Sequence, residues 1–425
     1  MRLLVVGGGG REHALCWALR HENPDADLYC APGNPGTADL ATNLPIAADD
    51  LDRIADAADM HGIDLTVVGP EVPLARGLAD RLRAEGRAVF GPSAAAAQLE
   101  ASKAFSKEVM QAAGIPTARS RTFTELHPAL DYVDRHAEPL VVKASGLAAG
   151  KGAVVCLTRA EAAAAVRSML GDRAFGEAGA TVVIESFLEG EEISVLAVTD
   201  GRDVELLPVS QDHKRLLEGD AGPNTGGMGA YSPVPIAGPE MVEQVMATAV
   251  QPTLDALLAD GISYRGVLYA GIMLTADGPK VLEYNVRFGD PECQVVVPRM
   301  ASDLGELCRA SAAGDPLPPV EFADDACVTV VLASEHYPEA PRTGDVIDGL
   351  DDVAALPDVC VFHAGTARRA DGAIVTAGGR VLAVSGSGPT IADARQRAYD
   401  AVGRITWPGM QHRTDIAHSA SGARR

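Results

Sequence analysis

The chain of 425 residues has few aromatic side chains and a shortage of positive charge. Phe, Trp and Tyr make up 4% of it, so its 47% of hydrophobic residues are mostly aliphatic. Its 58 acidic and 36 basic residues give a net charge of −22. A general nucleic-acid-binding protein is therefore not expected, because phosphate backbones require clustered Lys and Arg. Each cation beside a glycine-rich segment is correspondingly more informative.

Patterned cysteines and long apolar runs are also absent from the sequence. The seven Cys residues are scattered without a CxxC pair or a Cys/His cluster, which favours reduced thiols in a cytoplasmic protein. The apolar run Leu3–Val6 is too short for a signal peptide, and no stretch approaches the ~20 apolar residues of a membrane-spanning helix. We therefore expect a cytoplasmic protein without a membrane partner.

The first hundred residues alternate between short apolar runs and helical spacing. Because the apolar runs are continuous, they predict a parallel sheet covered by helices. We expect strands at 3–6, 27–31, 65–68 and 88–90, and helices at 11–20, 51–61 and 74–85. These elements predict an N-terminal α/β domain.

The rest of the chain divides into a middle and a last region. In the middle region we expect helices at 102–113, 159–170 and 303–312, strands at 139–143, 153–157, 180–185 and 193–198, and a hairpin of 267–274 with 280–285. Residues 212–231 are polar and glycine-rich without periodicity, which predicts a loop. In the last region we expect strands at 326–332 and 380–385, a helix at 391–405 and a disordered tail from Ala417.

Two glycine-rich loops resemble known phosphate-binding motifs without matching them. Gly7–Gly10 follows a strand and opens a helix, but the third small residue of a dinucleotide fingerprint and the acidic residue after the second strand are missing, which disfavours an NAD site. The loop could still hold a phosphate monoester beside Arg11, or it could be a plain tight turn. Gly146–Gly152 lacks the first Gly and the final Ser or Thr of a P-loop. A strand ending in Lys143, followed by glycines and a returning strand, instead predicts a flap over a triphosphate.

An acidic segment closes the predicted hairpin. Glu283 and Asn285 are two residues apart at a strand end, so both side chains should lie on one face. A carboxylate and an amide oxygen are suitable ligands for Mg²⁺ that bridges phosphates. Arg287 continues the same face if the strand persists, and its guanidinium could hold a carboxylate or an acyl phosphate with two hydrogen bonds. The sequence therefore predicts a metal–nucleotide site here.

Eight segments between residues 9 and 382 follow an order that resembles the phosphoribosylamine–glycine ligases, a family of the ATP-grasp superfamily. Their number and order are more specific than any single segment. They are Gly9–Ala14, Val68–Glu71, Gly146–Gly152, Gln211–Arg215, Gly222–Tyr231, Arg287–Glu292, Phe362–Thr366 and Gly378–Leu382.

The resemblance implies an α/β fold of three parts: an N-terminal parallel βαβ domain (1–101), an ATP-grasp core of two α+β lobes (102–325) with a mobile flap subdomain (about 120–190), and a small C-terminal α+β domain (326–425). It implies that ATP drives the joining of glycine to 5-phosphoribosylamine through glycyl phosphate, with Mg²⁺ or Mn²⁺ as the metal, in purine biosynthesis. ATP, glycine and phosphoribosylamine would be the partners of a monomer or weak homodimer that binds no nucleic acid.

The resemblance also assigns roles to residues. Glu283 and Asn285 would bind the metal, and Asp212, His213, Lys214 and Arg287 would face glycine and the acyl phosphate. ATP would contact Lys103, Lys143, Gly146, Gly150, Lys151, Gly152, Glu185, Phe187, Leu188 and Glu192. The substrates would contact Gly9, Gly10, Arg11, Glu71, Asn224, Thr225, Gly226, Gly227, Met228, Gly289, Asp290 and Pro291.

The chain departs from the wider pattern at two positions. Many ATP-grasp enzymes carry a further acidic metal ligand about 13 residues before the Glu, where this chain has Ala270; glycine ligases of the family share that feature. The flap usually continues Lys-Ala-Asp-Gly, whereas here Ser145 replaces the Asp. Two alternatives stay open from the residues alone: an ATP-grasp ligase for another acid or amine, and a nucleotide-binding module without catalysis.

Overall fold

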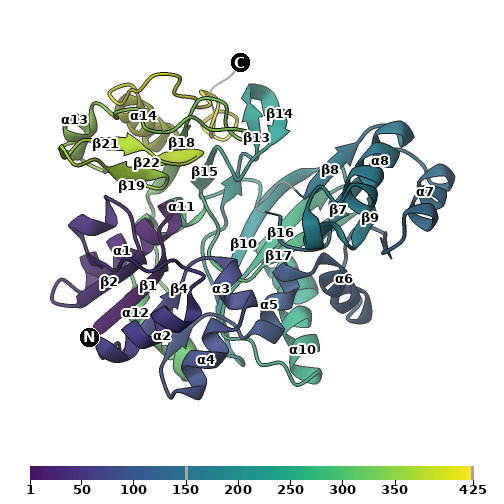
Figure 1. Cartoon of the computed structure of the whole chain (residues 1–425), viewed down its shortest axis with the longest axis horizontal. Coiled ribbons are helices and arrows are strands. Elements are labelled where there is room, and N and C mark those ends of the chain that lie inside the picture. The colour runs from purple at the N-terminus through teal and green to yellow at the C-terminus, as the bar shows by residue number, and fades with distance from the viewer. Residues whose placement is uncertain (149–151, 423–425) are drawn as a thin grey trace.

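The structure, a computed structural model, describes residues 1–148 and 152–422. An N-terminal domain, a protruding flap and a C-terminal domain lie around a central sheet (Figure 1). In the described part of the chain, no helix combines the length and the apolar character needed to cross a membrane.

The N-terminal domain confirms the predicted parallel sheet. Its five strands lie in the order β3-β2-β1-β4-β5, all parallel, and the side chains of Leu3 to Val6 on β1 are fully buried. The strands are β1 (Arg2–Gly7), β2 (Asp27–Pro32), β3 (Thr42–Asn43), β4 (Leu65–Val68) and β5 (Val89–Phe90). The helices are α1 (Gly10–Glu22), α2 (Leu51–Met60), α3 (Glu71–Ala75) and α4 (Leu78–Ala84).

The single helix expected over 74–85 was wrong, because the segment forms the two helices α3 and α4. Gly77 separates them with a φ of +89°, a left-handed conformation that interrupts the helix. The first of the two helices, α3, starts directly after Pro70, so Glu71 lies in its first turn.

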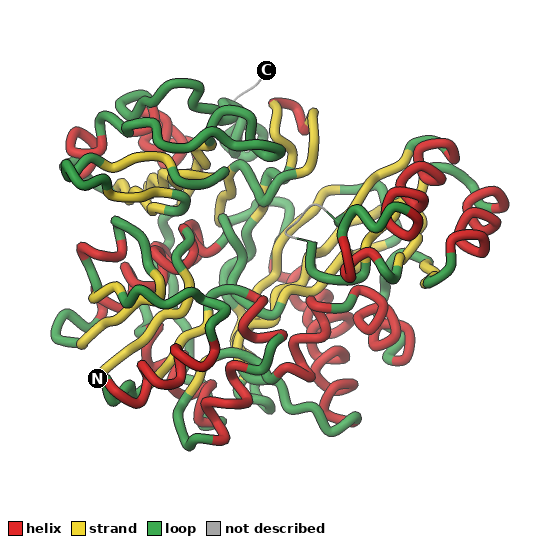
Figure 2. The backbone as a smooth tube through the Cα atoms, viewed as in Figure 1, coloured by secondary structure: helices red, strands yellow, loops and turns green. Residues whose placement is uncertain are grey.

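The middle of the chain forms two antiparallel sheets. The flap sheet has the order β6-β9-β7-β8 and the central sheet the order β11-β10-β16-β17. Figure 2 shows the flap strands with two helices packed beside them. The flap comprises β6 (Ser120–Phe123), α7 (Leu126–Arg135), β7 (Leu140–Ala144), β8 (Ala153–Cys156), α8 (Arg159–Val166) and β9 (Val182–Ser186). The central lobe comprises β10 (Glu191–Thr199), β11 (Val204–Leu206), β16 (Gly266–Thr275) and β17 (Gly278–Asn285), with α5 (Ala94–Ala101), α6 (Lys103–Ala112), α9 (Pro239–Val245) and α10 (Gln251–Ala259).

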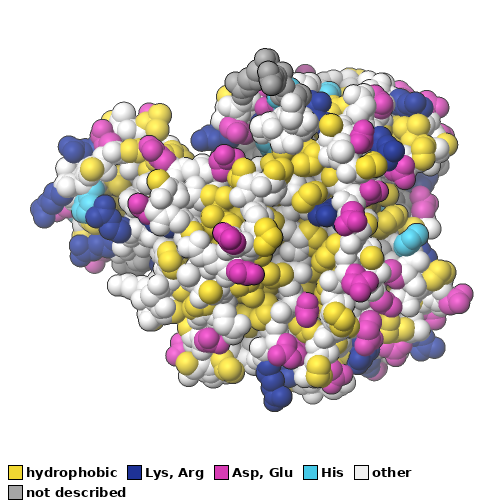
Figure 3. All heavy atoms as spheres, turned by 180° about the vertical axis from the view of Figure 1, so that it is seen from behind, with side chains coloured by type: hydrophobic (Ala, Val, Ile, Leu, Met, Phe, Trp, Pro, Cys, Tyr) yellow, Lys and Arg dark blue, Asp and Glu magenta, His cyan; other side chains and the backbone are white. Residues whose placement is uncertain are grey.

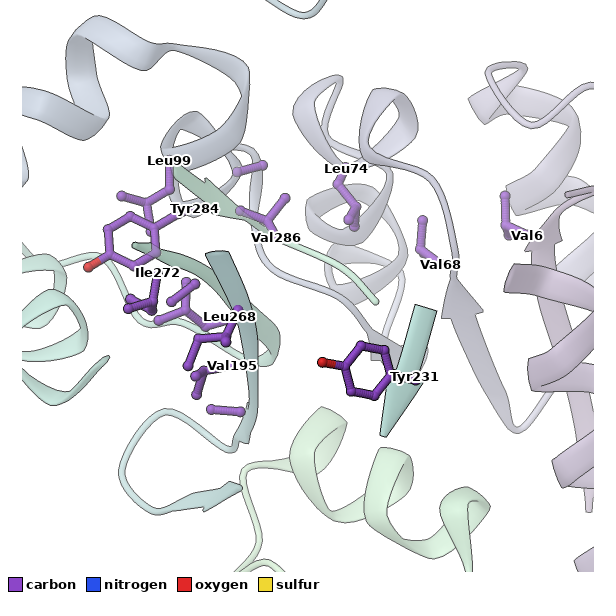
Figure 4. Packing of buried hydrophobic residues seen from close by; sticks show 14 of the residues in the cluster. Val6, Val68, Leu74, Leu99, Val195, Tyr231, Leu268, Ile272, Tyr284 and Val286 are labelled. Carbon is purple, nitrogen blue, oxygen red and sulfur yellow. The ribbon is translucent and has the colours of Figure 1, made fainter. Parts of the chain in front are cut away.

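The predicted hairpin is confirmed as the pair β16 and β17, which turns at Gly278 with a φ of +104°. Its inner face belongs to a large apolar core that continues into the N-terminal domain. Figure 4 shows Leu268, Ile272, Tyr284 and Val286 in this core, with Val68 and Leu74 on the N-terminal side. The core thus joins the hairpin end to the parallel sheet.

The C-terminal sheet contains strands that the sequence did not predict. The stretch 212–231, expected to be a loop, forms four short strands, and two of them join the C-terminal sheet in the order β12-β15-β18-β22-β19. These four strands are β12 (Gln211–Asp212), β13 (Arg215–Leu217), β14 (Ala221–Asn224) and β15 (Gly229–Ser232). Strands of two to four residues give no periodicity, which explains the wrong prediction.

The remaining elements complete the C-terminal domain and its contact with the core. The strands are β18 (Ala326–Ala333), β19 (Val359–His363), β20 (Thr366–Arg368), β21 (Ile374–Thr376) and β22 (Arg380–Gly388), and the helices are α11 (Cys293–Val296), α12 (Leu304–Ala313), α13 (Leu350–Ala354) and α14 (Ile391–Val402). The prediction of disorder from Ala417 was wrong at its first residue. Ala417 is completely buried, and its N–H group donates to His213 at 3.3 Å.

The excess of acidic residues is unevenly distributed over the surface. Seen from behind, Asp and Glu side chains are spread over the body of the molecule, whereas Lys and Arg side chains gather on the flap (Figure 3). On this face, the acidic side chains therefore lie mainly over the body of the molecule.

Candidate active site

The end of β17 places the predicted metal ligands on one face of the central sheet. Tyr284, between them, points the other way and receives a hydrogen bond from Thr253 of α10 at 2.6 Å. Asn285 lies on the same face as Glu283, opposite to Tyr284, and its Oδ1 atom accepts a hydrogen bond from Arg287 at 3.4 Å. The alternation predicted for Glu283 and Asn285 is therefore present, whereas β17 ends at Asn285 and Arg287 reaches the Asn285 side chain from beyond the strand.

Three lysines surround the Glu283 carboxylate. Burial would raise its pKa, but Lys214, Lys143 and Lys103 act together with Arg287 to lower it to about 2. The group is therefore ionised at any physiological pH. A permanent carboxylate beside an amide oxygen fits a divalent cation that also binds phosphate oxygens. Within the described residues, no position brings three His, Cys, Asp or Glu side chains together as a complete metal site.

The strand next to Glu283 shows where the additional acidic ligand is missing. The spacing argument pointed to Ala270, but Ala270 pairs with Tyr284 and is fully buried in the core. Gly271 is the residue that pairs with Glu283, and a Cβ atom on it would lie 3.5 Å from Glu283 and 3.7 Å from Glu192. The position is therefore Gly271, and its small size leaves room between the two carboxylates.

Glu192 and Glu283 share one ammonium group. Lys214 forms a very short ion pair with Glu192 and lies 3.6 Å from Glu283. The carboxylates outweigh the effect of burial and hold the pKa of Lys214 well above its usual value. Lys214 is therefore a fixed cation between the positions that we assigned to ribose and to metal.

The flap contributes a buried cluster around Glu185. Its carboxylate lies 3.1 Å from Lys143 Nζ and 3.2 Å from Lys107 Nζ, and all three side chains are buried. Lys143 also donates to the carbonyl of Leu282 at 3.1 Å, which joins the flap strand β7 to the end of β17. The prediction that Lys143 is more than a solvated strand-end lysine is supported by this burial. Phe187 and Leu188 follow at the junction of β9 and β10 and are partly exposed.

Ser145, where the family usually has Asp, supports the start of α6. Its hydroxyl accepts the N–H group of Ala104 at 3.0 Å, and its carbonyl accepts that of Lys103 at 2.8 Å. Lys103 Nζ in turn donates to the carbonyl of Gly146 at 3.3 Å. Ser102 is the N-cap residue of α6, and Ser145 accepts two further N–H groups of the first turn, including that of Lys103. Of the remaining flap positions, Gly152 is buried, whereas Gly150 and Lys151 lie outside the described residues.

Arg287 connects the hairpin to the N-terminal domain. Its guanidinium lies 2.7 Å from Glu100 and 3.3 Å from Glu71, and it is only 16% exposed. Glu100 also accepts the N–H group of Val286 at 2.8 Å. Burial opposes the charge, but the two carboxylates raise the pKa of Arg287 above its usual value. A buried acid, Glu100, and a half-buried one, Glu71, therefore hold this cation in place.

The glycine loop at the start of α1 is closed by an acidic side chain. Glu12 accepts the N–H group of Gly9 at 2.6 Å and pairs with Arg11 at 2.6 Å. Cβ atoms on Gly7, Gly9 and Gly69 would each lie under 3.0 Å from Glu12. The glycines make room for this carboxylate, which fills the space that a dinucleotide pyrophosphate would need. One amide that we assigned to a phosphate therefore already has an acceptor.

Asp212 is a buried carboxylate with an unused oxygen. Its Oδ1 atom has no hydrogen-bond partner among the described residues. Burial and the neighbouring Glu292 raise the pKa of Asp212 well above its usual value, while Lys214 and Arg380 act in the opposite direction. Glu292 itself accepts from Ser194 at 3.0 Å and from Tyr269 at 2.8 Å. A bound cation would stabilise the ionised form of Asp212.

The glycine-rich turn 224–228 lies beside Asp212. A Cβ atom on Gly227 would lie 2.6 Å from Asp212 Oδ1 and 2.5 Å from Pro291. Thr225 holds the turn by accepting the N–H group of Gly227 at 3.0 Å and donating to the Lys214 carbonyl at 2.9 Å. The turn thus brings together two segments, 224–228 and 289–291, that the resemblance assigns to the substrates. Met228 is completely buried, and Asn224 is partly exposed.

His13 and His363 join the N-terminal and C-terminal domains. The His363 N–H group donates to His13 Nδ1 at 2.7 Å, and the two rings lie 5.7 Å apart. Burial lowers the pKa of His13 to about 3 and that of His363 to about 4, and His363 adds to the effect on His13. Both rings are therefore neutral at physiological pH.

This pair predicts that stability falls with acidity. The unfolded rings bind protons below a pH of about 6.5, and the folded rings do not until about pH 3 to 4, so unfolding takes up protons in that window. The stabilisation is fully present above pH 6.5 and decreases as the pH falls toward 4. Denaturant titrations across this range should show the decrease, and His13→Gln should flatten it; an equal pH slope in both proteins would contradict the assignment.

Five residues of this site were not predicted from the sequence. Glu100 and Lys107 lie on helices without any motif, so the sequence carried no indication of them. Glu292, Arg380 and Glu12 lie within quoted segments, but their partners come from other parts of the chain. The missed residues are Glu12, Glu100, Lys107, Glu292 and Arg380.

Comparison with known families accounts for all three parts of the chain. The N domain of phosphoribosylglycinamide synthetase matches residues 1–100, its ATP-grasp (A) domain matches 101–293, and its C domain matches 327–419. The phosphoribosylamine–glycine ligase of Xanthomonas campestris pv. campestris is 49% identical over 429 residues, covering 100% of this chain and 99% of the relative.

Solved structures agree with this result. The crystal structure of phosphoribosylamine–glycine ligase from Thermotoga maritima matches with a TM-score of 0.85 and 34% identity, covering 98% of this chain and 100% of that one. The biotin carboxylase domain of 2-oxoglutarate carboxylase from Hydrogenobacter thermophilus, solved with MgADP and bicarbonate, has a TM-score of 0.74 at 19% identity and covers 97% of this chain and 91% of that one. The second similarity shows a shared fold.

Proposed function

This chain belongs to the phosphoribosylglycinamide synthetase family, and on that premise we propose that it is the ATP-dependent ligase that joins glycine to 5-phosphoribosylamine in purine biosynthesis. The products are N1-(5-phospho-D-ribosyl)glycinamide, ADP and phosphate. The observation that carries the proposal is the junction at the end of β17, where Glu283, Lys214 and Arg287 lie between three domains.

ATP occupies the space between the flap and the central sheet. Lys103 and Lys143, which act with Lys214 to lower the pKa of Glu283, offset charge on the phosphate oxygens. The backbone after Glu185, at Phe187 and Leu188, holds the adenine. Glu192 faces the ribose hydroxyls, and Gly146, Gly150, Lys151 and Gly152 close over the phosphates. The burial of Lys143 and its contact with Leu282 support this orientation.

Glu283 and Asn285 would hold Mg²⁺ or Mn²⁺ beside the phosphates of ATP. Two protein oxygens are a sufficient set, because Mg²⁺ commonly uses one or two carboxylates along with substrate phosphates and water. The bound ion would supply electrostatic stabilisation of the transferred phosphoryl group. Lys214 contributes a second positive charge between Glu192 and Glu283.

Glycine binds between Asp212 and Arg287. Its ammonium group takes the unused Oδ1 atom of Asp212, and its carboxylate turns toward Arg287 and Lys214, with His213 lining the same segment. A carboxylate oxygen of glycine attacks the γ-phosphorus of ATP and ADP leaves, which gives glycyl phosphate. Closure of the flap excludes water, because an acyl phosphate hydrolyses.

Phosphoribosylamine approaches from the N-terminal domain. The substrate lies against the loop Gly9–Arg11 and against Glu71, which already contacts Arg287 at 3.3 Å. Its amine attacks the acyl carbon of glycyl phosphate, the amide bond forms, phosphate leaves and the amine loses a proton. The segments Asn224–Met228 and Gly289–Pro291 form the wall between the two substrates.

The Asp212 assignment predicts a selective loss of glycine binding. Asp212→Asn keeps the shape of the side chain but removes its negative charge, so the KM for glycine should rise about 10- to 100-fold, the usual range for a hydrogen bond to a charged group. The affinity for ATP, measured by calorimetry without glycine, should stay within about twofold. An unchanged KM for glycine would remove Asp212 from the ammonium site.

The function itself is tested by ADP release with defined substrate pairs. Purified protein should release ADP only when ATP, glycine and phosphoribosylamine are all present, and mass spectrometry should detect the glycinamide ribonucleotide. Replacing glycine with alanine or serine, and phosphoribosylamine with simple amines, supplies the controls. Faster turnover with another acid and amine would assign the chain to a different ATP-grasp reaction.

The finer points of organisation belong to the same proposal. We place the domain boundaries at residues 1–101, 102–325 and 326–425, with a mobile flap at about 120–190. The enzyme works in the cytoplasm as a monomer or weak homodimer, without nucleic-acid or membrane partners. The net charge of −22 supports the absence of a nucleic-acid partner, because phosphate backbones require clustered cations.

A further inference from the structure

One guanidinium of the C-terminal domain gathers three segments that are distant in sequence. Arg380, at the start of β22, donates through Nη1 to the carbonyls of Asp290 at 2.7 Å and of Gly227 at 3.4 Å, and makes a very short contact with the carbonyl of Gly226. Its Nη2 pairs with the carboxylate of Asp290 at 2.8 Å. Three carbonyls and a carboxylate therefore converge on one planar fork, a geometry that Arg provides and Lys does not.

A second side chain of the same domain holds the other side of this turn. The Tyr337 hydroxyl accepts the N–H group of Gly226 at 3.0 Å, and its ring packs against the backbone of Gly379, next to Arg380. The peptide groups of Gly226 are thus fixed at both ends, the N–H by Tyr337 and the carbonyl by Arg380. A Cβ atom on Gly226 would lie 3.0 Å from the guanidinium carbon, so the turn is packed directly on the cation.

The turn that is held in this way packs directly against the buried Oδ1 atom of Asp212. Gly227 has a φ of +108°, and its Cα faces both Asp212 Oδ1 and Pro291. Asp290 adjoins Pro291 and is itself fixed by Gln294, which donates to Asp290 Oδ1 at 2.7 Å. A displacement of the Gly226–Gly227 peptide would therefore alter the space in front of the unused Asp212 oxygen, although Arg380 does not touch that oxygen.

We propose that Arg380, in the C-terminal domain, is a positioning residue for the part of the site that binds the amino acid. Its guanidinium fixes the Gly226–Gly227 turn against Asp290, and the Tyr337 hydroxyl holds the other side of the same turn. The inference rests on the proposed function, because it assigns the space beside Asp212 to glycine. It adds a role for the C-terminal domain, which supplies the shape of the glycine pocket through backbone contacts. Without the guanidinium, four acceptors would face one another without a donor, and the turn would move.

The main test compares Arg380→Ala with Arg342→Ala. Arg342 lies in the same domain and pairs with two acids, Glu335 and Asp345, but the contacts found for it do not involve the turn. We expect Arg380→Ala to raise the KM for glycine at least about 10-fold and to leave ATP affinity within about twofold, whereas Arg342→Ala changes neither. Added guanidinium ion, at concentrations that do not unfold the protein, should partly restore the glycine KM of Arg380→Ala.

Hydrogen exchange provides a readout that does not depend on catalysis. In the resting protein, the amides of Gly226 and Gly227 should exchange faster in Arg380→Ala than in the wild type or in Arg342→Ala. If wild-type protein releases no ADP with glycine, the proposed function fails. The exchange result still decides whether Arg380 fixes the Gly226–Gly227 turn.

Two outcomes would overturn the inference. One is an Arg380→Ala protein with an unchanged KM for glycine in an otherwise active enzyme; the other is unchanged exchange of the Gly226 and Gly227 amides. If Arg380→Ala does not fold, Tyr337→Phe decides, because it removes a single oxygen atom. Tyr337→Phe should raise the KM for glycine about 2- to 10-fold with normal ATP affinity, and no rise would overturn the inference.

Discussion

Replacing Glu283 with Gln lowers kcat for glycine-dependent ADP formation by at least about 100-fold, the usual loss when one preorganised charge contact to a transferred group is removed. The carboxylate is ionised because three lysines and Arg287 hold its pKa near 2, and glutamine keeps the shape without the charge. The lysines would then face the phosphates without an anion to bind the metal. Coupled measurement of ADP release at saturating ATP and Mg²⁺ gives the number.

The turn of the same hairpin provides the control. Asp277→Asn changes an exposed carboxylate that pairs only with Lys280 on this hairpin, and it should leave kcat unchanged. Binding of Mn²⁺ in the presence of ADP, followed by electron paramagnetic resonance, should weaken in Glu283→Gln and not in Asp277→Asn. Near-normal turnover of Glu283→Gln, with its fold intact by circular dichroism, would contradict the assignment of Glu283 as a metal ligand.

Replacing Arg287 with Met destabilises the protein by about 3–5 kcal/mol, because it leaves buried acids without their cation. Glu100 is 8% exposed at its side chain and lies 2.7 Å from the guanidinium, and Glu71 also loses its partner. The same change removes the cation that we place on the glycine carboxylate, so activity should also disappear. Urea denaturation and ADP release measure the two losses separately.

A second substitution separates the structural from the chemical part of this effect. Arg287→Met combined with Glu100→Gln removes both charges of the closer pair, so at least about 1 kcal/mol of stability should return. Activity should not return, because the glycine carboxylate still lacks its cation. A double variant no more stable than Arg287→Met alone would show that Glu100 is not the acid left unpaired.

Local patterns explain why much of the fold and part of the site could be predicted. The parallel sheet follows from continuous apolar runs such as Leu3–Val6, and the hairpin follows from two apolar strands around a glycine turn. The pairing of Glu283 with Asn285 on one face needs only the alternation of a strand. In each case, residues that act together are neighbours in sequence.

The unpredicted part depends on contacts between distant residues. The neighbour of Glu283 is Gly271 and not Ala270, because strand register is set by pairing across the hairpin, where a bulge follows Gly271. Glu100 meets Arg287 across 187 positions, and Arg380 meets Asp290 across 90. The periodicity of a sequence carries no information about such long-range contacts.

The pairing of β12 with β15, and of β15 with β18, limits how this chain can be divided. By its hydrogen bonds, the segment that carries Asp212, Lys214 and Gly227 belongs to a sheet whose other strands begin about a hundred positions later, at Ala326. A protein truncated before Ala326 would keep these residues but lose the strands that pair with their segment. Chimaeras between relatives should therefore exchange residues 211–232 together with the C-terminal domain, because the proposed glycine pocket is built from both of these separate stretches of the chain.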